Sequence, residues 1–596
     1  MQSPRVRRLP RYRASMTGVC ALAVAGSLLG TSADAATVER STGVPVDARL
    51  LSPGAEARTV TGRSLTRSSA ARADVTGDPV LRSRPIPSVA GAAMSRVRGG
   101  EAGSERLVAE MPAQRKKPFE TVAVTWDDNS APQDMDVHVR VRSAEGWSRW
   151  QHLEYALDEG PAADEESGVR DGTAPWWSGP ADAVAVRVHS ASGQSPTGLS
   201  VVTIDDPAVP AAGLSTAAGS STASVAAAST AIAGSASPGA PIARSPRFPA
   251  RPHVVTRPQW HANESLGDSC DSPVYGKTIK MAIVHHTVGD NDYTRSESPA
   301  IVRSIHAYHT QGQNWCDIGY NFLVDRFGTI YQGRAGGVQL PVRGAHSGDY
   351  NVNTSGISMM GNFEQRPPSK RMKNAMVRLV GWRLGTSYRE PRSRTTVAGD
   401  SFRRISGHRD AMSTACPGGQ AYAWLPTLRN RVADYLKRFS SPVRRKAAAM
   451  GADRTGPVFA GEMLVGNGRR TDFTRGSLVG NRATGVRWLS GAALKRYDSV
   501  GGARGVLGMP VSRFYRSPAG VRTMKFEHGR ILRRPDGEAK ALWGRILLRY
   551  GKAGYTGGRL GLPRTSVQRV SYGSKAVFQH GVIRYDRSSG RVTVSR

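Results

Sequence analysis

The chain has few cysteines, few acidic residues and no long apolar run. With four cysteines in 596 residues, it is not a small scaffold held together by disulfides. The mostly apolar stretch at residues 16–29 is too short to span a membrane. Asp and Glu number 47 against 82 Lys and Arg, which gives a formal net charge of +35. A chain of this length predicts several domains, because single cores stop growing well below it.

The first 35 residues have the pattern of an export signal. Five arginines precede the apolar stretch, and Ala33-Asp34-Ala35 forms a small-x-small cleavage site. We therefore expect residues 1–35 to be removed and the mature protein to be secreted, with no transmembrane segment. The positive charge favours an anionic partner, and for an exported chain this is a wall polymer or membrane surface rather than nucleic acid. The alternative is a compositional background, since the arginine-rich charge is spread along the whole chain.

Composition divides the N-terminal half of the chain. Residues 36–112 are rich in Ala, Ser, Gly and Arg, which predicts extended or disordered chain. Between 113 and 207, runs such as 121–126 and 136–142 alternate with period two, which predicts a small all-β sandwich or jelly roll. The Ala-, Ser- and Gly-rich residues 208–252 predict a flexible linker. Four tryptophans of the β domain are candidates for stacking on sugar rings or, alternatively, for its core: Trp147, Trp150, Trp176 and Trp177.

The C-terminal part repeats itself after a basic linker at residues 441–456. Phe473, Phe526 and Phe578 each begin a Phe-x-x-Gly motif. The segments 507–510 and 560–563 share the pattern Leu-Gly-Met/Leu-Pro. A fixed period of about 50 residues predicts an array of similar units over 457–596. These motifs resemble the LGFP-type repeats of secreted actinobacterial wall proteins, which implies attachment to the wall; the alternative is a purely stabilising β-rich array.

Two segments carry residue types that bind zinc. An apolar run at 279–284 ends in His285 and His286, which predicts a buried strand with histidine at its C-terminal end. His408 lies eight residues before Cys416, and Pro417 turns the chain just after it. Two imidazoles and one thiolate leave the fourth tetrahedral position open, as in catalytic zinc sites. Because side chains alternate along a strand, His285 and His286 cannot both face one metal.

Five ordered blocks extend this pattern: residues 283–287, 315–324, 344–346, 356–363 and 406–418. Together they resemble the zinc N-acetylmuramoyl-L-alanine amidases of the peptidoglycan recognition protein and phage-lysozyme type. The resemblance implies an α/β domain over 253–440, with a central mixed sheet flanked by helices and Zn²⁺ as cofactor. It implies His285, His408 and Cys416 as metal ligands and Tyr320 and Thr414 as catalytic residues. The implied substrate groove comprises Thr287, His309, Gln313, Asn314, Trp315 and His346. The pair Asn314-Trp315 leaves open whether the stem peptide carries diaminopimelate or lysine.

The resemblance also bears on the cysteines. Export removes Cys20, and the resemblance assigns Cys416 to the metal, which leaves Cys270 and Cys316 as the expected disulfide; the alternative is three free thiols. We expect a secreted, wall-associated enzyme that hydrolyses the amide between N-acetylmuramic acid and L-alanine in peptidoglycan. Two alternatives are a recognition module that binds peptidoglycan without cutting it and a wall-organising protein in which the repeats matter most.

Overall fold

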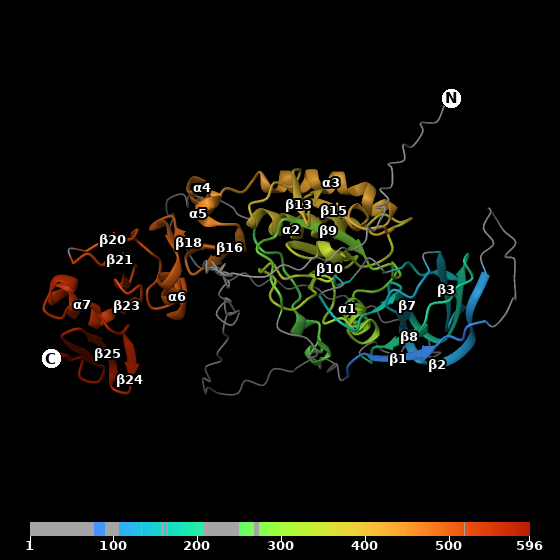
Figure 1. Cartoon of the computed structure of the whole chain (residues 1–596), viewed down its shortest axis with the longest axis horizontal. Helices are drawn as coiled ribbons and strands as arrows, with labels where there is room; N and C mark the ends of the chain where they lie inside the picture. Colours follow the sequence, from blue (N-terminus) through green and yellow to red (C-terminus); the bar gives the residue numbers. More distant parts are fainter. Residues whose placement is uncertain are drawn as a thin grey trace, which may run out of the picture. The chain divides into compact units, whose positions relative to one another are not determined.

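The computed structural model describes residues 77–89, 106–132, 134–155, 160–162, 165–207, 249–267, 273–517 and 519–596 (Figure 1). All of them belong to one of the chain's two compact units, residues 56–596. The expected export signal and most of the expected linker lie outside the described residues, and so does Cys270, so the Cys270–Cys316 pairing stays a prediction. Within the described residues, no helix is both long and apolar enough to cross a membrane.

The N-terminal domain is all β, as predicted. Its eight strands form one antiparallel sheet in the order β1-β8-β2-β7-β3-β4, with β5 paired to β3 and β6 to β2. The valines of β3 stand at alternate positions and are all buried. With side chains of β2, β7 and β8 they form one apolar core. The strands are β1 (Val80–Pro85), β2 (Arg106–Asp127), β3 (Met135–Ser143), β4 (Gly146–Trp147), β5 (Gln151–His152), β6 (Arg170–Gly172), β7 (Trp176–Ser190) and β8 (Ser200–Asp205).

This sheet begins earlier in the chain than the sequence indicated. Strand β1 and the first residues of β2 lie within 36–112, where we expected extended or disordered chain. Strand β1 is a sheet edge that pairs only with β8, and most of its side chains are exposed. An edge strand of this kind needs no alternating apolar pattern, so periodicity could not reveal it.

The central domain contains a five-stranded sheet in the order β11-β10-β12-β9-β15. All neighbours are parallel except the antiparallel β10–β11 pair. Helices α2 and α3 cover one face and α1 lies on the other (Figure 1). The sheet consists of β9 (Met281–His286), β10 (Phe322–Val324), β11 (Ile330–Gln332), β12 (Thr354–Met359) and β15 (Ile405–Gly407); the main helices are α1 (Ser298–Ala307), α2 (Lys370–Thr386) and α3 (Gly419–Leu436), and β13 (Arg394–Val397) and β14 (Asp400–Arg403) form a separate hairpin.

Burial on both faces explains why the sequence of β9 is apolar throughout. Ala282 and Val284 pack in the core beneath α2 and α3, whereas Met281 and Ile283 pack on the opposite side. Helix α1 begins at Ser298 with proline in its first turn, where the missing N–H costs no helical hydrogen bond. The N-cap of α2 is Ser369, whose hydroxyl accepts a hydrogen bond from the Met372 amide at 3.0 Å.

The C-terminal part contains three four-stranded antiparallel sheets, the first two of which are each followed by a helix. The repeated residues make equivalent contacts: the hydroxyl of Tyr497 donates to the Gly508 carbonyl at 3.0 Å, and that of Tyr550 to the Gly561 carbonyl at 2.8 Å. The elements are β16 (Val458–Val465), β17 (Gly468–Phe473), β18 (Gly476–Asn481), β19 (Gly485–Leu489), α6 (Gly491–Ser499), β20 (Tyr515–Arg516), β21 (Arg522–Lys525), β22 (Gly529–Arg533), β23 (Ala539–Trp543), α7 (Gly544–Lys552), β24 (Gln568–Val570), β25 (Gly573–Phe578), β26 (Gly581–Asp586) and β27 (Val592–Ser595).

Residues 441–456, which we expected to be a linker, form two short helices, α4 (Pro442–Met450) and α5 (Ala452–Thr455). Ser441 caps α4 by accepting hydrogen bonds from the amides of residues 443 and 444. Val443 and Ala447 are buried against β-strand residues such as Val458. The basic residues of this segment lie on the solvent side of α4. They dominate its composition, so the few apolar residues on the buried side did not reveal a packed helix.

Candidate metal centre

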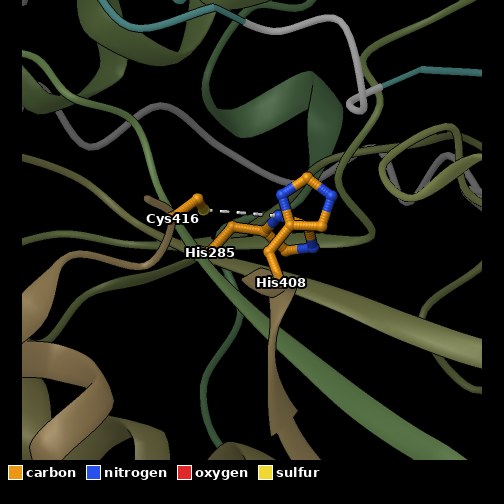
Figure 2. Close-up of side chains that lie close together, drawn as sticks. All are labelled: His285, His408 and Cys416. Carbon is orange, nitrogen blue, oxygen red and sulfur yellow. Dashed lines mark hydrogen bonds between the residues drawn. The ribbon is translucent and has the colours of Figure 1, made fainter. Parts of the chain in front are cut away.

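His285, His408 and Cys416 come together in the central domain. One ligand atom from each, an imidazole nitrogen or the thiol sulfur, lies within 4.8 Å of the other two, and all three residues are buried. The Sγ atom of Cys416 is 3.8 Å from Nδ1 of His285. Figure 2 shows the three side chains pointing toward one another. Among the described residues, this is the one such group of three or more potential metal ligands.

The sheet explains how residues 123 positions apart meet. His285 lies near the end of β9, and β15 runs parallel beside β9 with Gly407 opposite Val284. His408 follows β15 directly, in a short helical turn at His408–Asp410. The carboxyl ends of the two parallel strands therefore deliver both histidines to the same edge of the sheet.

The loop after this turn holds the Cys416 thiol in place. The amide of Arg409 donates to the Cys416 carbonyl at 2.9 Å, and the Cys416 amide donates to Oγ1 of Thr414 at 3.2 Å. The backbone amide of His286 points at Sγ from 3.4 Å. An N–H donor aimed at sulfur favours the thiolate, which is the form that binds metals.

Burial favours the neutral form of two histidines at the cluster, His285 and His346. Burial lowers the pKa of His285 to about 3. Its Nε2 atom lies 3.1 Å from Nδ1 of His346, whose pKa burial also lowers well below the usual value. This contact fixes the His285 ring with Nδ1 toward the sulfur. His346, which we expected in the substrate groove, thus lies directly against His285, where an outer partner can orient a metal ligand.

Two further predicted residues lie beside the cluster. Tyr320 is buried, with its ring centroid 5.4 Å from that of His285. Thr414 is partly exposed and uses its oxygen to accept from the Cys416 amide, which leaves its O–H group available to donate.

His286 faces away from the cluster, as strand alternation requires. Its Nε2 atom lies 3.2 Å from a carboxylate oxygen of Glu154, a residue of the N-terminal domain. Its Nδ1 atom lies 3.3 Å from the Phe363 amide, which donates to it.

The other expected groove residues are largely buried. Thr287 accepts a hydrogen bond from the Gly361 amide at 2.9 Å. His309 stacks on Trp315 with ring centroids 4.4 Å apart, and burial lowers its pKa to about 3. Gln313 is buried next to Asn314, which is the one exposed member of the set.

The sequence analysis missed the N-terminal acidic residues that contact this region. Glu154, Glu165 and Glu166 of the N-terminal domain bond to residues of the central domain. A compositional signal was present: six of the 13 residues from 154 to 166 are Asp or Glu, in a chain that is otherwise strongly basic. Two arginines that receive these carboxylates, Arg334 and Arg343, were missed as well.

Comparison with known proteins agrees with this architecture. A family profile described as "N-acetylmuramoyl-L-alanine amidase" matches residues 275–419. Mouse peptidoglycan recognition protein 1 is 33% identical over 170 residues, which cover 28% of this chain and 84% of the mouse protein. The chain belongs to the peptidoglycan recognition protein family. Peptidoglycan-recognition protein SC1a of Drosophila melanogaster is 32% identical over 169 residues, covering 28% of this chain and 80% of that protein.

The flanking regions of this family member match other profiles. One described as "Rv3811 N-terminal galactose-binding domain-like" matches residues 71–215, and the LGFP repeat profile matches 457–505 and 507–558. The solved structure of Drosophila PGRP-LB is 25% identical, with a TM-score of 0.24, and covers 29% of this chain and 93% of that chain. The family match supports peptidoglycan binding or peptidoglycan amidase activity, and the LGFP repeats indicate association with the cell wall.

Proposed function

We propose that the chain is a secreted, zinc-dependent N-acetylmuramoyl-L-alanine amidase that cuts the amide between N-acetylmuramic acid and L-alanine of the stem peptide. The observation that carries the proposal is the cluster of His285, His408 and Cys416, whose ligand atoms all lie within 4.8 Å of one another. Peptidoglycan recognition alone requires no such cluster, whereas metal-assisted hydrolysis does.

The residues fit zinc by their chemistry. Two neutral imidazoles and one thiolate match the nitrogen and sulfur ligands that Zn²⁺ prefers, and three protein ligands leave one position for water or substrate. A zinc ion held there would lower the pKa of a bound water to about 7 and polarise the scissile carbonyl.

The surrounding residues have separate roles in this proposal. His346 holds the His285 ring, and the His286 amide stabilises the thiolate of Cys416. Tyr320, beside His285, would hydrogen-bond the oxygen that develops negative charge. The O–H of Thr414, at the partly exposed loop before Cys416, would donate to the substrate carbonyl.

Binding of the polymer would involve more of the chain. We assign the stem peptide to the groove formed by Thr287, His309, Gln313, Asn314 and Trp315. The LGFP repeats over 457–596 and the β domain would keep the enzyme on the wall, where the positive charge of the chain favours anionic polymers.

Product analysis tests the proposal. Purified peptidoglycan is digested with the wild type, Cys416→Ser and His253→Ala, and products are identified by mass spectrometry. His253 is an exposed histidine of the same domain outside the cluster, so its variant is the matched control. Free stem peptides from the wild type and the control, but not from Cys416→Ser, support the amidase. Binding without peptide release by all three proteins would overturn it in favour of a recognition module.

A further inference from the structure

Part of the N-terminal domain lies on the groove that we assign to the stem peptide. We call the described residues 160–162 and 165–170 the cover. They precede and include the start of strand β6, in the acidic stretch noted above. In the central domain, the cover contacts charged side chains, asparagine side chains, backbone groups and the Trp315 ring.

Two carboxylates of the cover pair with arginines of the central domain. Glu166 lies 2.5 Å from Nη2 of Arg334 and accepts a second hydrogen bond from the Cys316 amide at 2.8 Å. Its side chain is only 3% exposed and that of Arg334 only 10%. Glu165 lies 3.3 Å from Nη1 of Arg343. A carboxylate buried this deeply needs both a charge partner and a hydrogen-bond donor, and Glu166 has both.

Backbone groups of the cover bond to the predicted groove itself. The Asn314 side-chain amide donates to the Gly168 carbonyl at 2.7 Å, and the Arg170 amide donates to the Gln313 carbonyl at 2.9 Å. Gly160 lies close to the Trp315 ring, because an added Cβ would be 3.1 Å from the indole. Three of the groove residues therefore already have a peptide partner from the same chain.

The burial of the metal-binding residues is consistent with a closed groove. His285 and His408 are 0% exposed, Cys416 3% and Tyr320 3%. A strand of peptidoglycan is a bulky polymer, and its scissile amide must reach these atoms for hydrolysis. The cover contacts Gln313, Asn314 and Trp315, so a stem peptide that binds along these residues would have to displace it.

The domain that carries the cover is anchored independently of it. Asp206 and Arg303 form a buried ion pair of 2.7 Å between the N-terminal domain and α1. The hydroxyl of Tyr308 donates to the Thr173 carbonyl at 2.8 Å, and Val202 and Ile204 pack on Tyr308. These contacts can hold the domain in place while the cover is released.

We propose that the cover is an autoinhibitory segment that occupies the groove as an acidic peptide would. Glu165 and Glu166 neutralise Arg343 and Arg334, so an incoming peptide with carboxylates must displace them. The apparent affinity for such a peptide is then reduced by the fraction of molecules in which the groove is open. This proposal rests on the assignment of the groove to a stem peptide.

The test compares the full-length wild type with the double variant Glu165→Gln/Glu166→Gln. Glutamine keeps the shape of the side chain but removes its charge and replaces one of its two acceptor oxygens with an NH2 donor. The single variant Glu165→Gln is the milder change, and Glu145→Gln, at an exposed carboxylate in the turn after β3, is the control. Binding of a soluble stem peptide is measured by calorimetry, and hydrolysis of peptidoglycan is followed separately.

We expect the double variant to bind the peptide at least ten-fold more tightly and to release stem peptides faster, with Glu165→Gln between it and the wild type. Unchanged or weaker binding in the double variant would overturn the proposal, and weaker binding would mean that the cover completes the groove. Absence of binding by every protein would overturn it too. Tighter binding by the double variant, without hydrolysis by any of the proteins, would support the autoinhibitory cover and contradict the proposed amidase activity.

Discussion

The Nε2 atom of His285 lies 3.1 Å from Nδ1 of His346, and both rings are completely buried. If a metal binds to Nδ1 of His285, the Nε2–H group donates to His346, which therefore sets the direction of the ligand lone pair. His346 would then act on the metal through this contact and not by coordination.

We accordingly predict that His346→Ala weakens zinc binding without abolishing it. Loss of an outer hydrogen-bond partner typically lowers metal affinity by about 10–100-fold. Competition against a chelator of known affinity measures the change, with His253→Ala as the control that keeps the affinity of the wild type. Equal zinc affinity in His346→Ala and the wild type would contradict this role.

The packing around His346 leads to a prediction about glycine. A Cβ atom at Gly356 of β12 would clash with the His346 ring, so alanine cannot be accommodated without moving the ring. We expect Gly356→Ala to destabilise the domain by about 1–3 kcal/mol, as overpacking does, and to weaken zinc binding. Thermal unfolding measures the loss of stability. Gly557→Ala, at a site with nothing within 4 Å of the added Cβ, is the control. A Gly356→Ala variant as stable as the wild type would show that the ring is free to shift.

Glu120, which accepts a hydrogen bond from the Asp206 amide at 3.0 Å, gives the stability of the N-terminal domain a dependence on pH. Burial, together with the nearby Asp205 and Asp206, raises the pKa of this carboxyl to about 7. The folded state therefore holds a proton that the unfolded state has lost above pH 4.5. The stability from this group is fully present below about pH 4.5 and is lost as the pH rises through about 7.

Glu120→Gln mimics the protonated carboxyl at every pH. We expect the variant and the wild type to have similar stability near pH 4.5. At pH 8 the variant should be more stable by roughly 1–3 kcal/mol, since each unit of pKa shift corresponds to about 1.4 kcal/mol. Denaturant unfolding at the two pH values measures the difference. A variant less stable than the wild type at pH 8 would argue against a buried, protonated Glu120.

Periodicity and spacing predicted much of the fold but only part of the site. The apolar run that ends in His285 and His286 is a local signal, and strand β9 formed where it was expected. The edge strand β1 and helix α4 were missed, because one has no buried face of its own and the other carries its apolar residues among basic ones.

The contacts between the N-terminal and central domains could not be predicted from the sequence. Glu154 and His286 are 132 residues apart, and Glu166 and Arg334 168 residues apart. The sequence around each of these residues does not indicate its partner, because the pairing depends on how the β domain packs on α1. The acidic stretch was visible, but its position over Asn314 and Trp315 follows only from the folded chain.

The most direct test of the zinc assignment is removal and return of the metal in one sample. The protein is dialysed against a chelator, and zinc content and release of stem peptides are measured before, after, and on addition of Zn²⁺. We predict about one zinc per chain initially, loss of peptide release with the metal, and recovery with one equivalent of Zn²⁺. Cys416→Ser should not recover. Full activity in the zinc-free protein, or a wild type that binds no zinc, would contradict the account.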